Sequence, residues 1–170
     1  MNLKSILTNR NMMKIIKRTA ALLALVIGLN SCSKDEKKEI DTDYPVISTA
    51  AQNAFPKQCS VIKRGEKFVF RASLTDNVQL GSVSIDIHHD FDHHNHSTEV
   101  SDCGLDPVKA PVKPFVLIQS YPIPTGLKNY DIQQEISVPA DIDPGDYHFL
   151  IRLTDQAGWQ TIRGLSIKIQ

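Results

Sequence analysis

Apolar and polar residues alternate along most of the chain from Tyr44 to the C-terminus. In residues 82–88, for example, Val83, Ile85 and Ile87 alternate with polar side chains. A period of two is typical of β-strands that bury one face. This alternation, or a short apolar run, predicts strands at residues 45–48, 58–62, 67–75, 82–88, 114–121, 131–138, 146–154 and 165–169.

Turn-forming residues separate these segments, and no segment shows the pattern of a capped amphipathic helix. About seven strands in about 125 residues predict an all-β, immunoglobulin-like sandwich of two sheets over residues 44–170. Two stretches resemble bacterial immunoglobulin-like modules: residues 72–77 with the strand that follows, and residues 144–158.

The N-terminal residues have the composition of a secretory signal peptide. Lys14, Lys17 and Arg18 precede an apolar stretch, residues 20–29, that is too short to span a bilayer, which takes about 20 apolar residues. The Met12-Met13 pair indicates that the signal peptide starts there. We therefore assign residues 1–31 to the signal peptide, 32–43 to a charged, flexible tether and 44–170 to the sandwich.

Leu29-Asn30-Ser31-Cys32, directly after the apolar stretch, resembles the lipobox of bacterial lipoproteins, in which the Cys carries the lipid. The resemblance implies that Cys32 anchors the domain to a membrane; an uncleaved signal or a transmembrane anchor is the alternative. The following residues, 33–36, resemble the acidic export signal of Bacteroidetes surface lipoproteins. We expect an outer-membrane, cell-surface location, with the periplasmic face as the alternative.

Charge and cysteine content agree with an extracytoplasmic protein. Residues 1–31 contain five basic and no acidic residues, so the remainder has a net charge of about −5. A mildly acidic domain argues against nucleic acid as a partner. Apart from Cys32, the chain has Cys59 and Cys103, which either form a disulfide bond or remain separate buried thiols.

Five of the six histidines fall within residues 88–96. Imidazole is a common ligand of zinc and copper, whereas calcium prefers oxygen. His88 ends one predicted strand and His148 lies near the start of another, and these strands are antiparallel neighbours in an immunoglobulin-like sandwich. The sequence therefore predicts a zinc or copper site on the outer face of a sheet, with these candidate ligands: His88, His94, His96, His148 and, as ligand or hydrogen-bond acceptor, Asp92.

Other interpretations of this segment remain open. It could be a solvated loop with weak metal affinity, a pH-sensing loop or a partner-binding loop. His148 could be an ordinary strand residue, and Phe91 could simply fix the loop to the sheet.

The stretch from Ile87 to His96, behind a lipobox and within a sandwich, resembles a Bacteroidetes lipoprotein family defined by domain of unknown function 4625. The resemblance implies location and fold rather than a reaction. No catalytic motif is present, so we expect a non-enzymatic metal-binding lipoprotein, an accessory to an outer-membrane metal transporter. The alternative is an adhesion module that binds glycan or protein through its loops, with Trp159 as the binding platform and Tyr121 and Tyr130 as weaker candidates.

Overall fold

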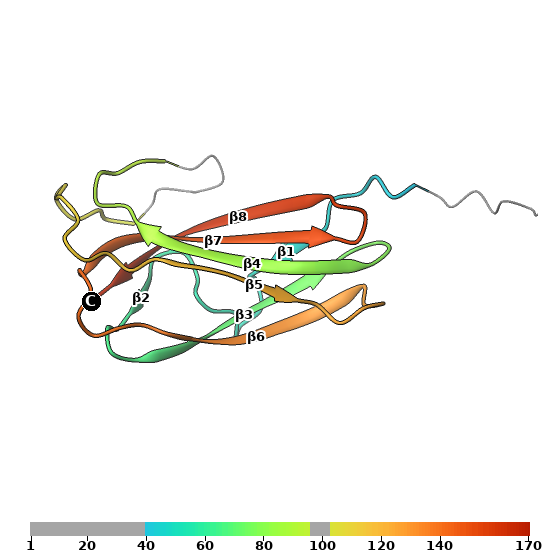
Figure 1. Ribbon diagram of the computed structural model, residues 1–170, viewed down its shortest axis with the longest axis horizontal. Helices are drawn as coiled ribbons and strands as arrows, with labels where there is room; N and C mark the ends of the chain where they lie inside the picture. The colour runs from blue at the N-terminus through green and yellow to red at the C-terminus, as the bar shows by residue number, and fades with distance from the viewer. Residues whose placement is uncertain (1–39, 96–102) are drawn as a thin grey trace, which may run out of the picture. The chain divides into compact units, whose positions relative to one another are not determined.

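The computed structural model describes residues 40–95 and 103–170, and the strands in these residues form two sheets (Figure 1). The eight described strands are β1 (Val46–Ser48), β2 (Ser60–Ile62), β3 (Lys67–Thr75), β4 (Leu80–His89), β5 (Leu117–Pro122), β6 (Asn129–Ser137), β7 (Gly145–Asp155) and β8 (Gln160–Ile169). The smaller sheet has the order β1-β3-β6 and the larger has the order β2-β8-β7-β4-β5. This division of strands is that of an immunoglobulin-like sandwich, which confirms the predicted fold class.

The core lies between the inner faces of the two sheets. Phe70 of β3 and Phe149 of β7 are both fully buried, and their ring centroids are 5.4 Å apart across the interface. Val83, Ile85 and Ile87 of β4 are buried too, whereas the residues that alternate with them are partly exposed. The alternation in the sequence therefore corresponds to the two faces of each sheet.

Strands β4 and β7 are antiparallel neighbours in the interior of the larger sheet. Their register places Ile85 opposite Ile151 and Ile87 opposite Phe149. Because β7 also pairs with β8 and β4 also pairs with β5, both strands are bonded on two sides. This pairing gives their ends fixed positions relative to each other.

Each of the eight described strands overlaps one of the eight segments predicted as strands, so the domain has one strand more than the approximate total of seven. The first part of the domain is divided between the sheets: β1 pairs with β3 in the smaller sheet, and β2 pairs in parallel with β8 in the larger one. Each of these strands has three residues. Strand β8 begins at Gln160, well before the predicted segment 165–169. The sequence did not predict its first half, because most of these residues are exposed and lack the apolar alternation.

Tyr147, at the start of β7, closes the corner that leads into this strand. Its hydroxyl donates a 2.6 Å hydrogen bond to the carbonyl oxygen of Asp143, four residues upstream, and accepts a 3.1 Å bond from the Phe115 backbone N–H. A tyrosine in this position is a hallmark of immunoglobulin-like sandwiches. Burial raises the pKa of the Tyr147 hydroxyl, which therefore stays protonated and can donate.

A disulfide bond joins Cys59 to Cys103 across 44 positions of the sequence. It is one of the two arrangements that the sequence left open. In the chain-entropy model a loop of this length contributes about 4 kcal/mol to stability by restricting the unfolded chain. The bond links the residue before β2 to the segment that follows the histidine loop.

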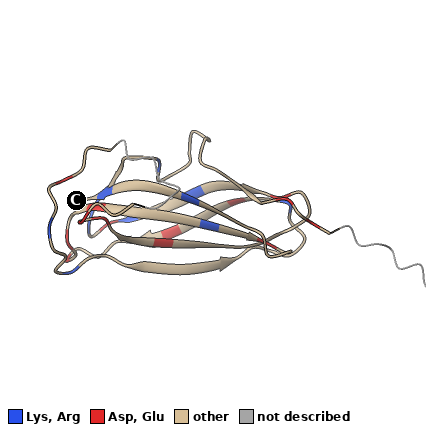
Figure 2. Cartoon of the chain, turned by 90° about the horizontal axis from the view of Figure 1, so that it is seen from above, with Lys and Arg blue, Asp and Glu red and all other residues tan. Residues whose placement is uncertain are grey.

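Residues 40–95 and 103–170 contain no helix that is long and apolar enough to cross a membrane. Lys and Arg residues are interspersed with Asp and Glu along the strands and loops (Figure 2).

Several predictions for the N-terminal part of the chain lie outside the described residues: the signal peptide, the Met12-Met13 start, Cys32 and the acidic export signal.

We expect Tyr147→Phe to lower the free energy of unfolding by about 2 kcal/mol, because the buried Phe115 N–H loses its acceptor. Urea denaturation followed by circular dichroism measures the change. Tyr130→Phe, which removes the hydroxyl of a half-buried tyrosine on β6, is the control and should change stability by less than about 0.5 kcal/mol. Equal effects of the two substitutions would contradict the role given to the Tyr147 hydroxyl.

Candidate metal centre

Strands β4 and β7 place two of the predicted histidines side by side. His88, near the end of β4, is directly opposite His148, near the start of β7, and their ring centroids are 5.2 Å apart. Their neighbours Ile87 and Phe149 are fully buried in the core, so the two imidazoles lie on the outer face of the larger sheet. The structure thus has the strand pairing that the sequence predicted.

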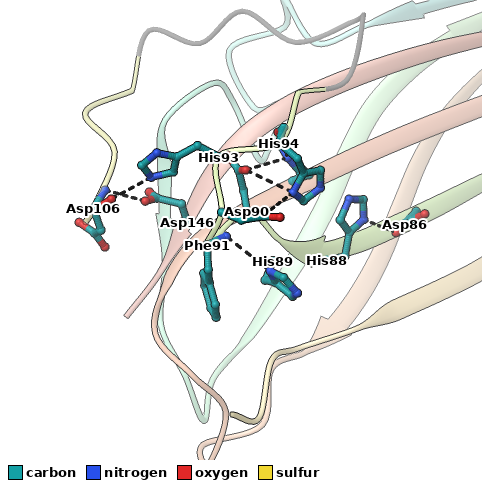
Figure 3. Close-up of polar contacts among 11 residues, drawn as sticks. Asp86, His88, His89, Asp90, Phe91, His93, His94, Asp106 and Asp146 are labelled. Atoms are coloured by element: carbon teal, nitrogen blue, oxygen red, sulfur yellow. Dashed lines mark hydrogen bonds and ion pairs between the residues drawn. The ribbon is translucent and has the colours of Figure 1, made fainter. Parts of the chain in front are cut away.

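The loop after β4 brings a third histidine over this pair. The Asp90 N–H donates to the carbonyl oxygen of Asp146, and the His93 N–H donates back to the carbonyl oxygen of Asp90, so the chain turns at once. His93 takes a left-handed conformation with φ of 59°. As a result the ring centroid of His94 lies 4.7 Å from that of His148. The His94 ring is also stacked on that of His88, with 5.5 Å between the centroids; Figure 3 labels both residues.

Phe91 fixes this loop to the domain. Its ring is buried, packs edge-on against Tyr147 at 5.3 Å, and has the Lys109 ammonium 4.3 Å from its centroid. Gly145 makes the close approach possible: its φ is +137°, and a Cβ at this position would lie 3.0 Å from a Phe91 ring carbon. The sequence interpretation of Phe91 as the residue that fixes the loop agrees with this packing.

Each of the three imidazoles has one ring nitrogen bonded to an oxygen. His88 Nδ1 lies 2.8 Å from an Asp86 carboxylate oxygen, and His94 Nδ1 lies 2.6 Å from an Asp92 carboxylate oxygen. His148 Nε2 lies 3.0 Å from the carbonyl oxygen of His94. Because these oxygens accept, the bonded nitrogens carry the protons, and the lone pair of each ring is on its other nitrogen. Metal-binding histidines in proteins are oriented in the same way.

The geometry of the three rings suits a transition metal. His88, His94 and His148 each offer a ligand atom, and these atoms all lie within 4.8 Å of one another. In a tetrahedral zinc site the ligand nitrogens are about 3.3 Å apart, given zinc–nitrogen distances of about 2.0 Å. Small side-chain rotations would therefore close the three histidines on an ion.

Two carboxylates add negative charge around the rings. A carboxylate oxygen of Asp90 lies 3.3 Å from His148 Nε2 and 3.6 Å from His94 Nδ1. Burial raises the pKa of Asp90, against the opposing attraction of His94 and His93, whereas the hydrogen bond with His94 lowers the pKa of Asp92. A cation held by the histidines would favour the ionised form of the buried Asp90 carboxyl.

The other two predicted ligands are Asp92 and His96. Asp92 is exposed and its carboxylate contacts His94 Nδ1. Of the two roles predicted for it, this contact fits that of hydrogen-bond acceptor. His96 lies outside the described residues. Two neighbouring histidines contact other groups: His89 Nδ1 accepts a hydrogen bond from the Phe91 N–H, and His93 Nε2 donates to the carbonyl oxygen of Asp106.

The burial of His148 was not predicted from the sequence. The residue lies on the outer face of the sheet, as the sequence predicted, but it is only 1% exposed, because the loop that carries Asp90 and His94 covers it. Asp86 and Asp90 were not among the candidate site residues. Both could have been found from the alternation itself, since residues 86, 88 and 90 share one face of an extended segment.

Trp159, the candidate platform for an adhesion module, contacts the start of the domain. Its ring centroid lies 5.0 Å from that of Tyr44, and its indole N–H donates to the carbonyl oxygen of Asp41. The residue remains 36% exposed. Tyr121 and Tyr130 are both partly buried against the core.

Comparisons with known proteins give a family match and distant structural likenesses. Residues 30–170 match the family described as "Domain of unknown function (DUF4625)". No curated protein matches the chain. Among solved structures, a chain described as "GspB Siglec domain" is 21% identical with a TM-score of 0.39, and the sporulation control protein Spo0M from Bacillus subtilis is 12% identical with a TM-score of 0.40. Each match covers 76% of this chain but only 59% and 50% of those chains, respectively.

We expect Phe91→Ala to lower the free energy of unfolding by about 3 kcal/mol and to release the His94 ring from the other two, because it removes the buried anchor of the loop. Urea denaturation gives the stability, and imidazole chemical shifts in NMR spectra report the ring contacts. Phe91→Leu keeps most of the buried volume and should preserve those shifts. An unchanged His94 resonance in Phe91→Ala would contradict the anchoring role.

Proposed function

We propose that this chain, which belongs to the family of domain of unknown function 4625, binds one zinc or copper ion through His88, His94 and His148. The family description assigns no activity, and the proposal rests on the geometry of these residues. The observation that carries the proposal is the convergence of three imidazoles whose ligand atoms lie within 4.8 Å of one another. Each ring is held by an oxygen acceptor, so little side-chain entropy is lost when the ion binds.

The chemistry of the ligands favours these metals. Three neutral imidazoles suit zinc and copper, whereas calcium and magnesium prefer oxygen. Asp92, His96 or water would complete the coordination. The Asp92 carboxylate already contacts His94, and its hydrogen bond with that ring lowers its pKa, which keeps it ionised.

Exposure of the ligands indicates binding that can be reversed. The side chain of His148 is 2% exposed, but those of His88 and His94 are 23% and 36% exposed. One ligand is therefore buried and two are open to solvent, which gives an ion a direct path in and out. This arrangement fits a protein that captures a metal and passes it on better than one that holds it permanently.

The proposed location follows from the sequence. A lipid on Cys32 would hold the domain at the outer membrane, on the cell surface or on the periplasmic side, and the charged tether would let the metal centre reach a partner. We propose an outer-membrane transporter as that partner and metal uptake as the process. The role is binding without catalysis.

Isothermal titration of the full chain, purified in detergent without a polyhistidine tag, should give one zinc or copper site of sub-micromolar affinity. His94→Ala and His148→Ala should each abolish this binding because each removes one of three protein ligands. His93→Asn is the matched control, since it removes a neighbouring imidazole that contacts Asp106 and keeps a residue that tolerates the left-handed conformation. A stoichiometry near zero, or equal loss in the control, would reject the site.

Asp86→Ala should lower zinc affinity by about 10- to 100-fold while the protein stays folded, because His88 loses the carboxylate that orients its ring. The affinity is measured by competition with a zinc-binding dye. Asp131→Ala, which removes an exposed carboxylate of the smaller sheet, should leave the affinity unchanged. A wild-type affinity in Asp86→Ala would show that the ring of His88 is oriented by other contacts.

A further inference from the structure

Three carboxylates converge at the opposite end of β4 from the histidines. Asp41 lies where the chain approaches β1, Asp76 lies in the turn between β3 and β4, and Asp155 ends β7. Each offers one oxygen, and these oxygens all lie within 4.8 Å of one another. Figure 1 shows the β3–β4 turn and the β7–β8 turn at the same end of the sandwich, beside the segment that leads into β1.

No cation compensates for these charges in the part of the chain that the structure describes. None of the three carboxylates has a Lys, Arg or His within ion-pair distance among residues 40–95 and 103–170. The nearby Lys128 ammonium donates instead to the carbonyl oxygen of Asn77. Like charges this close repel one another, and Asp155 is only 4% exposed, so solvent screens its charge poorly.

In Asp76 and Asp155, hydrogen bonds satisfy only one of the two carboxylate oxygens. Asp155 Oδ1 accepts from the backbone N–H groups of Gly158 and Trp159, at 2.6 and 2.8 Å. Asp76 Oδ2 accepts from those of Val78 and Gln79, at 2.8 and 2.6 Å. The second oxygen of each carboxylate, Asp155 Oδ2 and Asp76 Oδ1, is buried without a hydrogen-bond donor.

A buried oxygen without a hydrogen-bond donor normally costs free energy, and a bound ion or water is one of the few explanations for such a group in a native protein. Here two of them belong to a cluster of three carboxylates. A bound cation would satisfy both oxygens and remove the repulsion at once.

We propose that Asp41, Asp76 and Asp155 bind a calcium ion. Calcium takes six to eight oxygen ligands, carboxylates and carbonyl groups among them, and accepts irregular geometry. The cluster contains no imidazole or thiolate, so it does not suit zinc or copper. With three protein carboxylates and water as the remaining ligands, we expect affinity in the range of about 10⁻⁴ to 10⁻³ M that is found in extracellular modules.

The ion would fasten the start of the domain to two turns. Asp41 is the first residue of the compact unit that runs to Gln170. Its carboxylate accepts a hydrogen bond from the Asn77 side chain, and its carbonyl oxygen accepts one from the Trp159 indole. Calcium bound at this point would hold the residue at which the tether joins the sandwich. The proposal does not depend on the histidine site, which lies at the other end of β4.

The test uses Trp159, the only tryptophan in the chain. Tb³⁺ replaces Ca²⁺ at oxygen sites and luminesces when a nearby indole is excited. The full chain should therefore give Tb³⁺ luminescence that excess Ca²⁺ removes and equimolar Zn²⁺ does not. Asp155→Asn keeps the acceptor for Gly158 and Trp159 but loses the second ligand oxygen, so it should reduce the signal at least tenfold.

Asp41→Asn provides a second variant outside the strands, and Glu135→Gln, which removes a surface carboxylate paired with Lys67, is the control. The order of melting temperatures of the wild type and Asp155→Asn should differ between EDTA and Ca²⁺. In EDTA, Asp155→Asn should be at least as stable as the wild type because repulsion is relieved, whereas in millimolar Ca²⁺ only the wild type and Glu135→Gln should gain stability. Absence of sensitised luminescence, or a gain in melting temperature with Ca²⁺ in Asp155→Asn and Asp41→Asn as large as in the wild type, would overturn the proposal.

Discussion

The antiparallel pairing of β4 with β7 is the constraint on which both ends of the domain depend. It places His88 opposite His148 at one end and Leu80 opposite Asp155 at the other. A slip of one residue would turn every side chain of one strand to the wrong face, so the apolar side chains that the two strands bury in the core fix the register. The register shifts only between Leu80 and Ser82, where Gly81 allows the strand to approach the carbonyl oxygens of residues 154 and 155.

The core also holds the loop that completes the histidine cluster. Tyr147 bonds to the Asp143 carbonyl at the corner before β7, and its ring is the surface on which Phe91 packs. The loop therefore rests on a residue whose own position is fixed by the fold. Because the segment between His88 and His94 is short and anchored in its middle, the third imidazole returns to the other two with little loss of chain entropy.

Local alternation and short apolar runs were enough to locate the strands, apart from the exposed first half of β8, and knowledge of which strands are neighbours was enough to pair His88 with His148. The burial of His148 could not be predicted, because it depends on the path of a loop that has no period. Nor could the cluster of Asp41, Asp76 and Asp155, whose members come from three separate segments and sit in ordinary turn sequences. Sequence alone does not distinguish an aspartate that closes a turn from one that closes a turn and keeps a second oxygen for an ion.

The two clusters follow the same structural principle with different chemistry. In each, a hydrogen bond within the protein holds a side chain, as Asp86 holds His88 and the Gly158 N–H holds Asp155, and each side chain of the cluster offers one ligand atom within 4.8 Å of the others. Imidazoles at one end suit a borderline metal and carboxylates at the other suit a hard one, so two cations could bind without competing. Since β4 runs from one cluster to the other and pairs with β7 throughout, binding at either end would stabilise the same pair of strands.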